Sequence, residues 1–247
     1  MPLTDNIRAR TWSAIFSQLP LSQPYQVDVS DESLCSETWM VNYADSIGPS
    51  NHEVFSAPAK SQPYVHDSIF LFLKAEHAAR EALLSFHSGR GTWALMDAHH
   101  ASLLYAKTVC AFFGVHILTY RNRSYVIDYF PEVGAETQRR AFRKKYINIA
   151  DPIRVMRWRS DLIAQRELWE IFLRIVAVCS FNDSRDSNFE LLRQQGLGSH
   201  KPERNKILYW LGHWTFPDDI LYPSMNLEFC RELRGTLRMM TSVTGTL

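Results

Sequence analysis

The sequence predicts a mainly α-helical protein, an antiparallel helical bundle that carries one β-hairpin and an irregular acidic N-terminal region. Apolar residues recur at helical spacing over two long stretches, residues 66–87 and 92–113. Sequence typical of strands, rich in β-branched and aromatic residues, follows at residues 115–130. Hydrophobic residues make up 46% of the 247 residues and charged residues 21%, so the chain has enough apolar material for a folded core.

The overall charge and apolar content exclude several classes of protein. The formal net charge is +1, so no field of the whole molecule attracts nucleic acid or membrane surfaces. No apolar run reaches the ~18–20 residues of a membrane span, and the N-terminus lacks an apolar signal region, so we expect a cytoplasmic protein without membrane contact. The four cysteines are far apart, and His99-His100 lacks a third ligand at helical spacing. No metal or cofactor is therefore expected.

The N-terminal part, residues 1–62, is expected to hold a helix at 4–19 and then an irregular acidic segment. Between residues 11 and 59 there is no lysine or arginine, while six acidic residues occur. Two short runs, residues 25–29 and 38–43, have a strand-like composition. The segment is either an irregular surface region with a small sheet, or an acidic arm that docks on a basic surface of this chain or of a partner.

The remaining residues, 63–247, are expected to form one helical domain. The helices predicted at 66–87 and 92–113 are separated by the short turn 88–91, which contains two glycines. A connection this short requires the two helices to lie antiparallel.

The predicted hairpin follows this helix pair. Its strands are expected at 115–120 and 124–130, with Arg121-Asn122-Arg123 as the turn. Further helices are expected in the second half of the chain, at 160–179, at 187–195, within 199–216 and from 224 onward.

A basic region begins at the hairpin turn. Eleven lysine and arginine residues but only five acidic residues lie between Arg121 and Arg166. Such a cluster can contact RNA phosphates through charge alone, without reading base sequence. The alternative is a helix face that is merely solvated. The cations expected to bind RNA are Arg139, Arg140, Arg143, Lys144 and Lys145.

Residues 199–223 form the segment whose sequence most indicates a function. A capping serine and an early proline favour a helix start there. Arg204 and Asn205 lie inside the predicted helix, Tyr209 follows, and His213 lies one turn further on. The chain has no Walker A loop, no nucleophile elbow and no zinc-protease motif, so the common catalytic signatures are absent.

The segment Gly91–Gly114 resembles the aromatic-and-alanine helix of HEPN domains (higher eukaryotes and prokaryotes nucleotide-binding). The resemblance lies in His99-His100-Ala-Ser-Leu-Leu-Tyr105 and in the alanine and phenylalanine residues that follow. HEPN domains are α-helical bundles, usually dimeric, and many are metal-independent ribonucleases of toxin–antitoxin and antiviral defence systems. Their motif is an arginine, often a polar neighbour, and then a histidine. Arg204 and Asn205 match it, but Tyr209 stands where the family has histidine.

The resemblance, which extends over residues 66–247, implies a metal-independent ribonuclease with Arg204, Asn205, Tyr209 and His213 as catalytic residues. The arginine would grip a phosphate with two parallel hydrogen bonds. A histidine with a pKa near ~6.5 can accept a proton from a ribose hydroxyl, whereas tyrosine, near ~10, is a poor base. His213, or His200 before the helix, is the candidate substitute base. Alternatively, Arg204 and Asn205 only attach their helix to the bundle.

Two hypotheses about function therefore stand. The first is a HEPN-like RNA-directed protein of a bacterial defence or toxin–antitoxin type system. The second is a non-catalytic HEPN-like subunit that acts as a protein–protein interaction scaffold in a larger complex. In either case we expect a homodimer or a heteromeric protein complex formed through residues 204–222, where Trp210, Trp214 and Phe216 supply aromatic surface.

Overall fold

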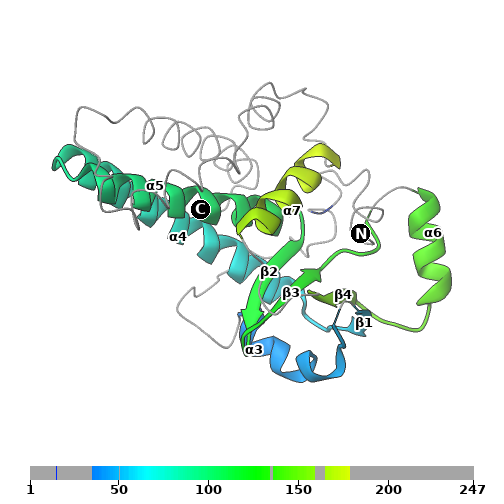
Figure 1. Cartoon of the computed structure of the whole chain (residues 1–247). Helices are drawn as coiled ribbons and strands as arrows, with labels where there is room; N and C mark the ends of the chain where they lie inside the picture. Colours follow the sequence, from blue (N-terminus) through cyan, green and yellow to red (C-terminus); the bar gives the residue numbers. More distant parts are fainter. Residues whose placement is uncertain (1–14, 16–34, 50, 134–135, 159–164, 179–247) are drawn as a thin grey trace. The chain divides into compact units, whose positions relative to one another are not determined.

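The computed structural model divides into two compact units (Figure 1). The first comprises Met1–Phe70 and Val109–Arg185, and the second comprises Leu71–Thr108 and Asp186–Leu247. Within them, the residues that the structure describes are 15, 35–49, 51–133, 136–158 and 165–178.

Two long helices form the predicted antiparallel pair, α4 (Ser61–His87) and α5 (Gly91–Phe112). In the first unit, the Tyr64 hydroxyl at the start of α4 donates to the carbonyl of Phe112 at the end of α5, at 2.8 Å. In the second unit, Ser85 near the end of α4 donates to Asp97 near the start of α5, at 3.3 Å. Contacts that join the start of one helix to the end of the other establish the antiparallel arrangement.

The turn between these helices is built on Gly89, whose φ is +70°. Its amide donates to the carbonyl of Phe86, and the amide of Arg90 donates to that of Ser85. This is the hydrogen-bond pattern of a Schellman motif, in which glycine adopts the left-handed conformation at low cost.

A four-stranded antiparallel sheet occupies the first unit, with strand order β1-β4-β3-β2. The hairpin of β2 and β3 lies where it was predicted, and Arg121 and Asn122 in its turn have φ of 47° and 58°. Two adjacent residues with positive φ are typical of the tight turns whose twist matches that of the strands. The strands are β1 (His52–Ser56), β2 (Val115–Tyr120), β3 (Arg123–Asp128) and β4 (Pro152–Arg157).

Shorter helices complete the first unit. Before the sheet lie α3 (Ser36–Trp39) and two 3-10 turns, η2 (Met40–Asn42) and η3 (Ala44–Ser46). The loop between β3 and β4 contains α6 (Glu136–Lys145), and α7 (Gln165–Val178) follows the sheet. The buried side chains of α7 recur at helical spacing, as predicted for this segment: Leu168, Trp169, Ile171, Phe172 and Ile175.

The prediction of a mainly α-helical bundle with a single hairpin is wrong, because β1 and β4 extend the hairpin into a four-stranded sheet. The reason lies in β4. Its arginines made residues 152–157 look like part of a solvated basic region, but Pro152 to Met156 are all buried. Such a strand, covered on both faces, lacks the alternation of polar and apolar residues that identifies a half-exposed strand.

The expected strand at 38–43 is also wrong, since these residues lie in α3 and η2. In the described part of the acidic segment the strand is instead β1, which begins at His52. Of the N-terminal helix predicted at 4–19 only residue 15 is described, and the run at 25–29 and the helices expected after residue 186 lie outside the described residues. No helix in the described part is long and apolar enough to cross a membrane.

A buried ion pair joins the two central strands. Asp128 of β3 lies opposite Arg154 of β4, and Arg154 Nη2 donates to Asp128 Oδ2 at 2.7 Å. The other carboxylate oxygen accepts the amide of Phe130 at 3.1 Å. Both side chains are almost fully buried, so either charge without the other would be left unpaired inside the protein.

We predict that Arg154→Met lowers the free energy of unfolding by about 3–5 kcal/mol, because it leaves the Asp128 carboxylate buried without its partner. The matched control is Arg121→Met, which removes an exposed ion pair with Asp45 and should cost less than about 1 kcal/mol. Adding Asp128→Asn to Arg154→Met should recover part of the loss, since the amide oxygen can still accept the Phe130 amide. Urea denaturation of the wild type and the three variants measures these losses, and equal losses for the two arginine variants would contradict the prediction.

Candidate functional site

The predicted RNA-binding cations lie on one helix, α6, which stands at one side of the sheet (Figure 1). All five side chains are exposed: Arg139, Arg140, Arg143, Lys144 and Lys145. The helix carries one acidic residue, Glu136, at its first position. Cations in the last turn also interact favourably with the negative end of the helix dipole. The sequence therefore places a concentrated positive charge where solvent and ligands can reach it.

Aromatic side chains hold the opposite face of α6. Phe142 is buried and its ring lies 4.8 Å from that of Tyr146, centroid to centroid. The ammonium group of Lys145 lies 5.1 Å from the centroid of the Tyr146 ring, a cation–π distance. At about 100° per residue, Arg139 and Arg143 share one line along the helix, beside Phe142, and Arg140 and Lys144 share the next line, opposite Phe142.

Two other cations of the basic region form ion pairs with carboxylates. Arg154 is buried against Asp128, and Arg121 Nη1 lies 3.0 Å from Asp45 Oδ2. The second pair is an exposed contact between one residue of the acidic N-terminal segment and the hairpin turn, and whether that segment docks on a basic surface stays a prediction. Asp128 belongs to the same region and Asp45 does not, so only the pair with Arg121 lowers the net charge counted over residues 121–166, and five of the eleven cations lie on α6.

Lys145 also acts on the sheet. Burial lowers the pKa of His52, at the start of β1, and the positive charges of Arg154 and Lys145 lower it further. The positive charge at the C-terminal end of α6 therefore disfavours protonation of His52, the first residue of β1.

The residues predicted to be catalytic, Arg204, Asn205, Tyr209 and His213, lie outside the described residues, and so does His200. Whether they come together stays a prediction. In the described part no group of three or more His, Cys, Asp or Glu side chains could hold a metal ion. His99 is buried on α5, and His100 is exposed.

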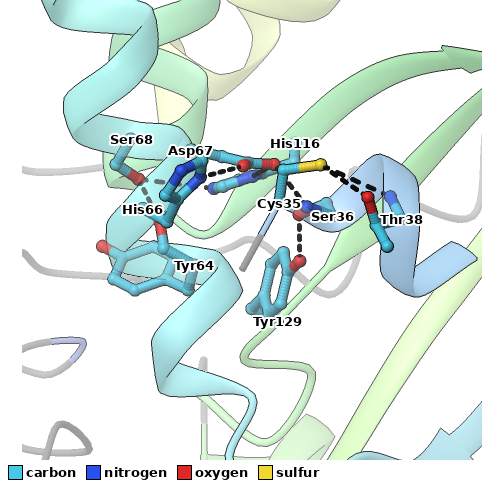
Figure 2. A network of polar contacts seen from close by, with 9 residues as sticks. All are labelled: Cys35, Ser36, Thr38, Tyr64, His66, Asp67, Ser68, His116 and Tyr129. Atoms are coloured by element: carbon cyan, nitrogen blue, oxygen red, sulfur yellow. Dashed lines mark hydrogen bonds and ion pairs between the residues drawn. The ribbon is translucent and has the colours of Figure 1, made fainter. Parts of the chain in front are cut away.

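A second cluster, which the sequence did not reveal, surrounds the carboxylate of Asp67 near the start of α4 (Figure 2). His66 Nδ1 lies 2.9 Å from Asp67 Oδ1, and the amide of Ser36 in α3 donates to Oδ2 at 3.1 Å. His116 of β2 places its Nδ1 3.7 Å from the same Oδ2, an electrostatic contact longer than a hydrogen bond. The Ser36 hydroxyl in turn bonds to the Tyr129 hydroxyl.

These contacts favour the ionised carboxylate. Burial alone would raise the pKa of Asp67, but the contact with His116 and the hydrogen bonds from Ser36 and His66 outweigh it, so the pKa is lowered. Burial raises the pKa of the Tyr129 phenol, and the nearby Asp67 charge raises it further. Tyr129 therefore stays a neutral phenol beside a negatively charged Asp67.

In this cluster a serine contacts a histidine, which contacts an aspartate, as in a catalytic triad. The geometry nevertheless does not support nucleophilic catalysis. Ser68 Oγ lies 3.4 Å from His116 Nε2, while it donates its proton to the carbonyl of Tyr64 at 2.7 Å. The hydroxyl proton is thus committed to the helix backbone rather than to the histidine. Ser68 and His116 are both buried, so a substrate has no access to them. The cluster joins α3, α4 and β2.

Sequence reasoning missed this cluster because its members come from residues 36, 66–68, 116 and 129. The adjacent pair His66-Asp67 was visible in the sequence. Its partners lie on other elements, and no local pattern links them.

The chain was also compared with known proteins. Neither a protein-family model, nor a curated protein, nor a solved structure matches it.

We predict that Asp67→Asn destabilises the fold at neutral pH by about 1–3 kcal/mol, because a buried charged acceptor is lost. The pKa of Asp67 is lower in the folded protein, so its contribution is complete above the unfolded pKa of ~3.9 and disappears as the pH falls through the folded pKa. The gap between wild type and Asp67→Asn should therefore close in acid. Denaturation curves at descending pH test this, with the exposed Asp45→Asn as control; a gap that widens in acid would refute the assignment.

Proposed function

We propose that this protein binds RNA through its phosphate backbone, with α6 as the contact element. The observation that carries the proposal is the exposure of all five cations on a ten-residue helix. Arginine and lysine side chains neutralise phosphates and release counterions, which supports binding without base contacts. The small net charge of the whole chain leaves this local cluster as the main source of attraction.

The arrangement of the cations supports contact with an extended strand. Residues four apart on a helix are about 6 Å apart along its axis. The two rows of α6, Arg139 with Arg143 and Arg140 with Lys144, can therefore each address more than one phosphate group. Arginine adds forked, bidentate contacts that lysine lacks. Tyr146, half-buried beside Lys145, offers a ring face at the end of the same helix.

We further propose that the protein is HEPN-like and acts on RNA in a bacterial defence or toxin–antitoxin type system. The residues that would catalyse RNA cleavage are Arg204, Asn205, Tyr209 and His213. The antiparallel pair of α4 and α5 supports this in a limited way, since the residues of the resemblance lie along α5. The catalytic part of the proposal rests on the sequence alone.

Replacing Arg143 and Lys144 by glutamine should weaken binding of a single-stranded RNA oligonucleotide and reduce its salt dependence. Each phosphate contact contributes about 0.7 to the slope of log K against log salt, so the double variant should lose about 1.4. Glutamine keeps the helix propensity of α6. Fluorescence anisotropy over a salt series measures both quantities.

The matched control is Arg80→Gln with Arg90→Gln, which removes two exposed arginines from another surface. This variant should keep the wild-type slope. Equal slopes for wild type and the α6 variant, or an equal loss in both double variants, would remove α6 as the binding element.

The catalytic proposal predicts that Arg204→Ala abolishes RNA cleavage in EDTA, because a phosphate loses its bidentate partner. Tyr209→His should keep or raise the rate, since it restores a base that titrates near neutrality. Gel assays of a labelled RNA report cleavage, with the Arg143 and Lys144 variant as a binding-deficient reference. Cleavage that survives Arg204→Ala or requires a metal would exclude the mechanism, and no cleavage by wild type or Tyr209→His is the result expected of a non-catalytic subunit.

A further inference from the structure

Among the described strands, β1 is an edge of the sheet, and its outer side has no backbone partner in that part of the chain. Two hydrogen bonds fix its orientation: the Arg157 amide donates to the Asn51 carbonyl, and the Ala57 amide donates to the Asp151 carbonyl, both at 3.1 Å. Because hydrogen-bonded positions alternate in an antiparallel pair, Glu53 and Phe55 also face β4. The amide and carbonyl groups of the other three residues therefore point away from the sheet: His52, Val54 and Ser56.

These outward groups are available. Among the described residues, no hydrogen bond reaches the backbone of His52 or Val54 on this side, and only the Ser56 carbonyl is contacted, by the Tyr43 hydroxyl at 3.3 Å. His52, Glu53 and Ser56 are exposed, and Val54 and Phe55 are half-buried. The strand contains no proline, lysine or bulge, which are devices that block pairing at a sheet edge.

We propose that β1 pairs antiparallel with β1 of a second copy of this chain, on a two-fold axis through Val54. The outward groups are symmetric about that residue, so Val54 would pair with Val54 of the second copy and His52 with Ser56. The Ser56 carbonyl can keep the Tyr43 contact, because a carbonyl oxygen accepts two hydrogen bonds. The two sheets would join into one continuous sheet.

The side chains of β1 also suit a second copy. In this register Glu53 lies opposite Phe55 of the partner copy, so no like charges face each other across the pair. The β-branched side chains of Val54 meet on the axis, a favourable cross-strand pair. Paired residues of an antiparallel sheet point to the same face, so both His52 side chains lie on one face of the joined sheet.

The assembly closes after two copies. The pairing is isologous, since each copy uses the same strand, and it consumes the β1 edge of both chains. The opposite edge of the sheet is β2, which does not take part. This interface is distinct from the one that the sequence suggested at residues 204–222.

Proline at position 54 tests the pairing without disturbing the sheet. The Val54 amide points away from β4, so Val54→Pro removes one outward donor from each copy and leaves the β1–β4 hydrogen bonds intact. We expect the full-length chain to dimerise at micromolar concentration and the variant to have a dissociation constant at least about tenfold higher, because each dimer loses two hydrogen bonds. Analytical ultracentrifugation over a concentration series measures both.

Two further variants keep the test decisive. Val54→Lys, which places like charges opposite each other on the axis, should also give a monomer, and it serves if the proline variant does not fold. Thr119→Pro, an outward position of the other edge strand, should leave the dimer unchanged. A wild-type monomer, or a dimer that survives both changes at Val54, would overturn the proposal, and so would a dimer lost only in Thr119→Pro.

Discussion

The buried ion pair between Asp128 and Arg154 fixes how β3 and β4 align, and the positions of β1 and α6 follow from that alignment. The hairpin of β2 and β3 forms from neighbouring residues, but β4 must return to it after a long connection. A buried charge pair between two strands is compatible with one register only, because shifting one strand by one residue would place the two charges on opposite faces of the sheet. Once β4 is placed, β1 can pair along its other side.

The connection between β3 and β4 is also where the charge of the protein is concentrated. It contains α6, whose Phe142 packs with Tyr146 just after the helix, while the cations of the helix are exposed. The arginines of this part of the chain are thus of two kinds, buried and exposed. Arg154 stabilises the interior together with Asp128, whereas Arg143 and its neighbours on α6 remain at the surface, where a phosphate backbone can reach them. The proposal of RNA binding depends on this separation.

The Asp67 cluster shows how similar constellations differ in what they can do. Ser68 contacts His116, which contacts Asp67, yet the serine proton is donated to the carbonyl of Tyr64, and the serine and the histidine are both buried. The same carboxylate receives the Ser36 amide and so attaches α3 to α4. Hydrogen bonds between side chains of different elements, such as these, favour one arrangement of the elements around them, although His116 Nδ1 makes only the longer electrostatic contact with Asp67.

The sequence by itself determined the features that depend on neighbouring residues. The antiparallel helix pair follows from helical periodicity and a short glycine turn, and the β2–β3 hairpin follows from two strand-like runs around a short turn, although Arg123, expected in the turn, is the first residue of β3. The density of cations on α6 was also visible, although not which of the surrounding arginines are neutralised. The catalytic role proposed for Arg204, Asn205, Tyr209 and His213 rests on the sequence alone, because these residues lie outside the described residues.

Only the tertiary structure decided the pairing of β4 with β1 and β3, and the partners of Asp67. Arg154 reads as a surface charge until Asp128 is found opposite it. The short run His52–Ser56 becomes a strand because β4 offers it a ladder of hydrogen bonds. Asp67 meets Ser36 and His116, which are far from it in the chain. Local patterns record the preferences of a segment, whereas these contacts depend on which distant segments meet, and a periodicity of two or 3.6 residues carries no information about that.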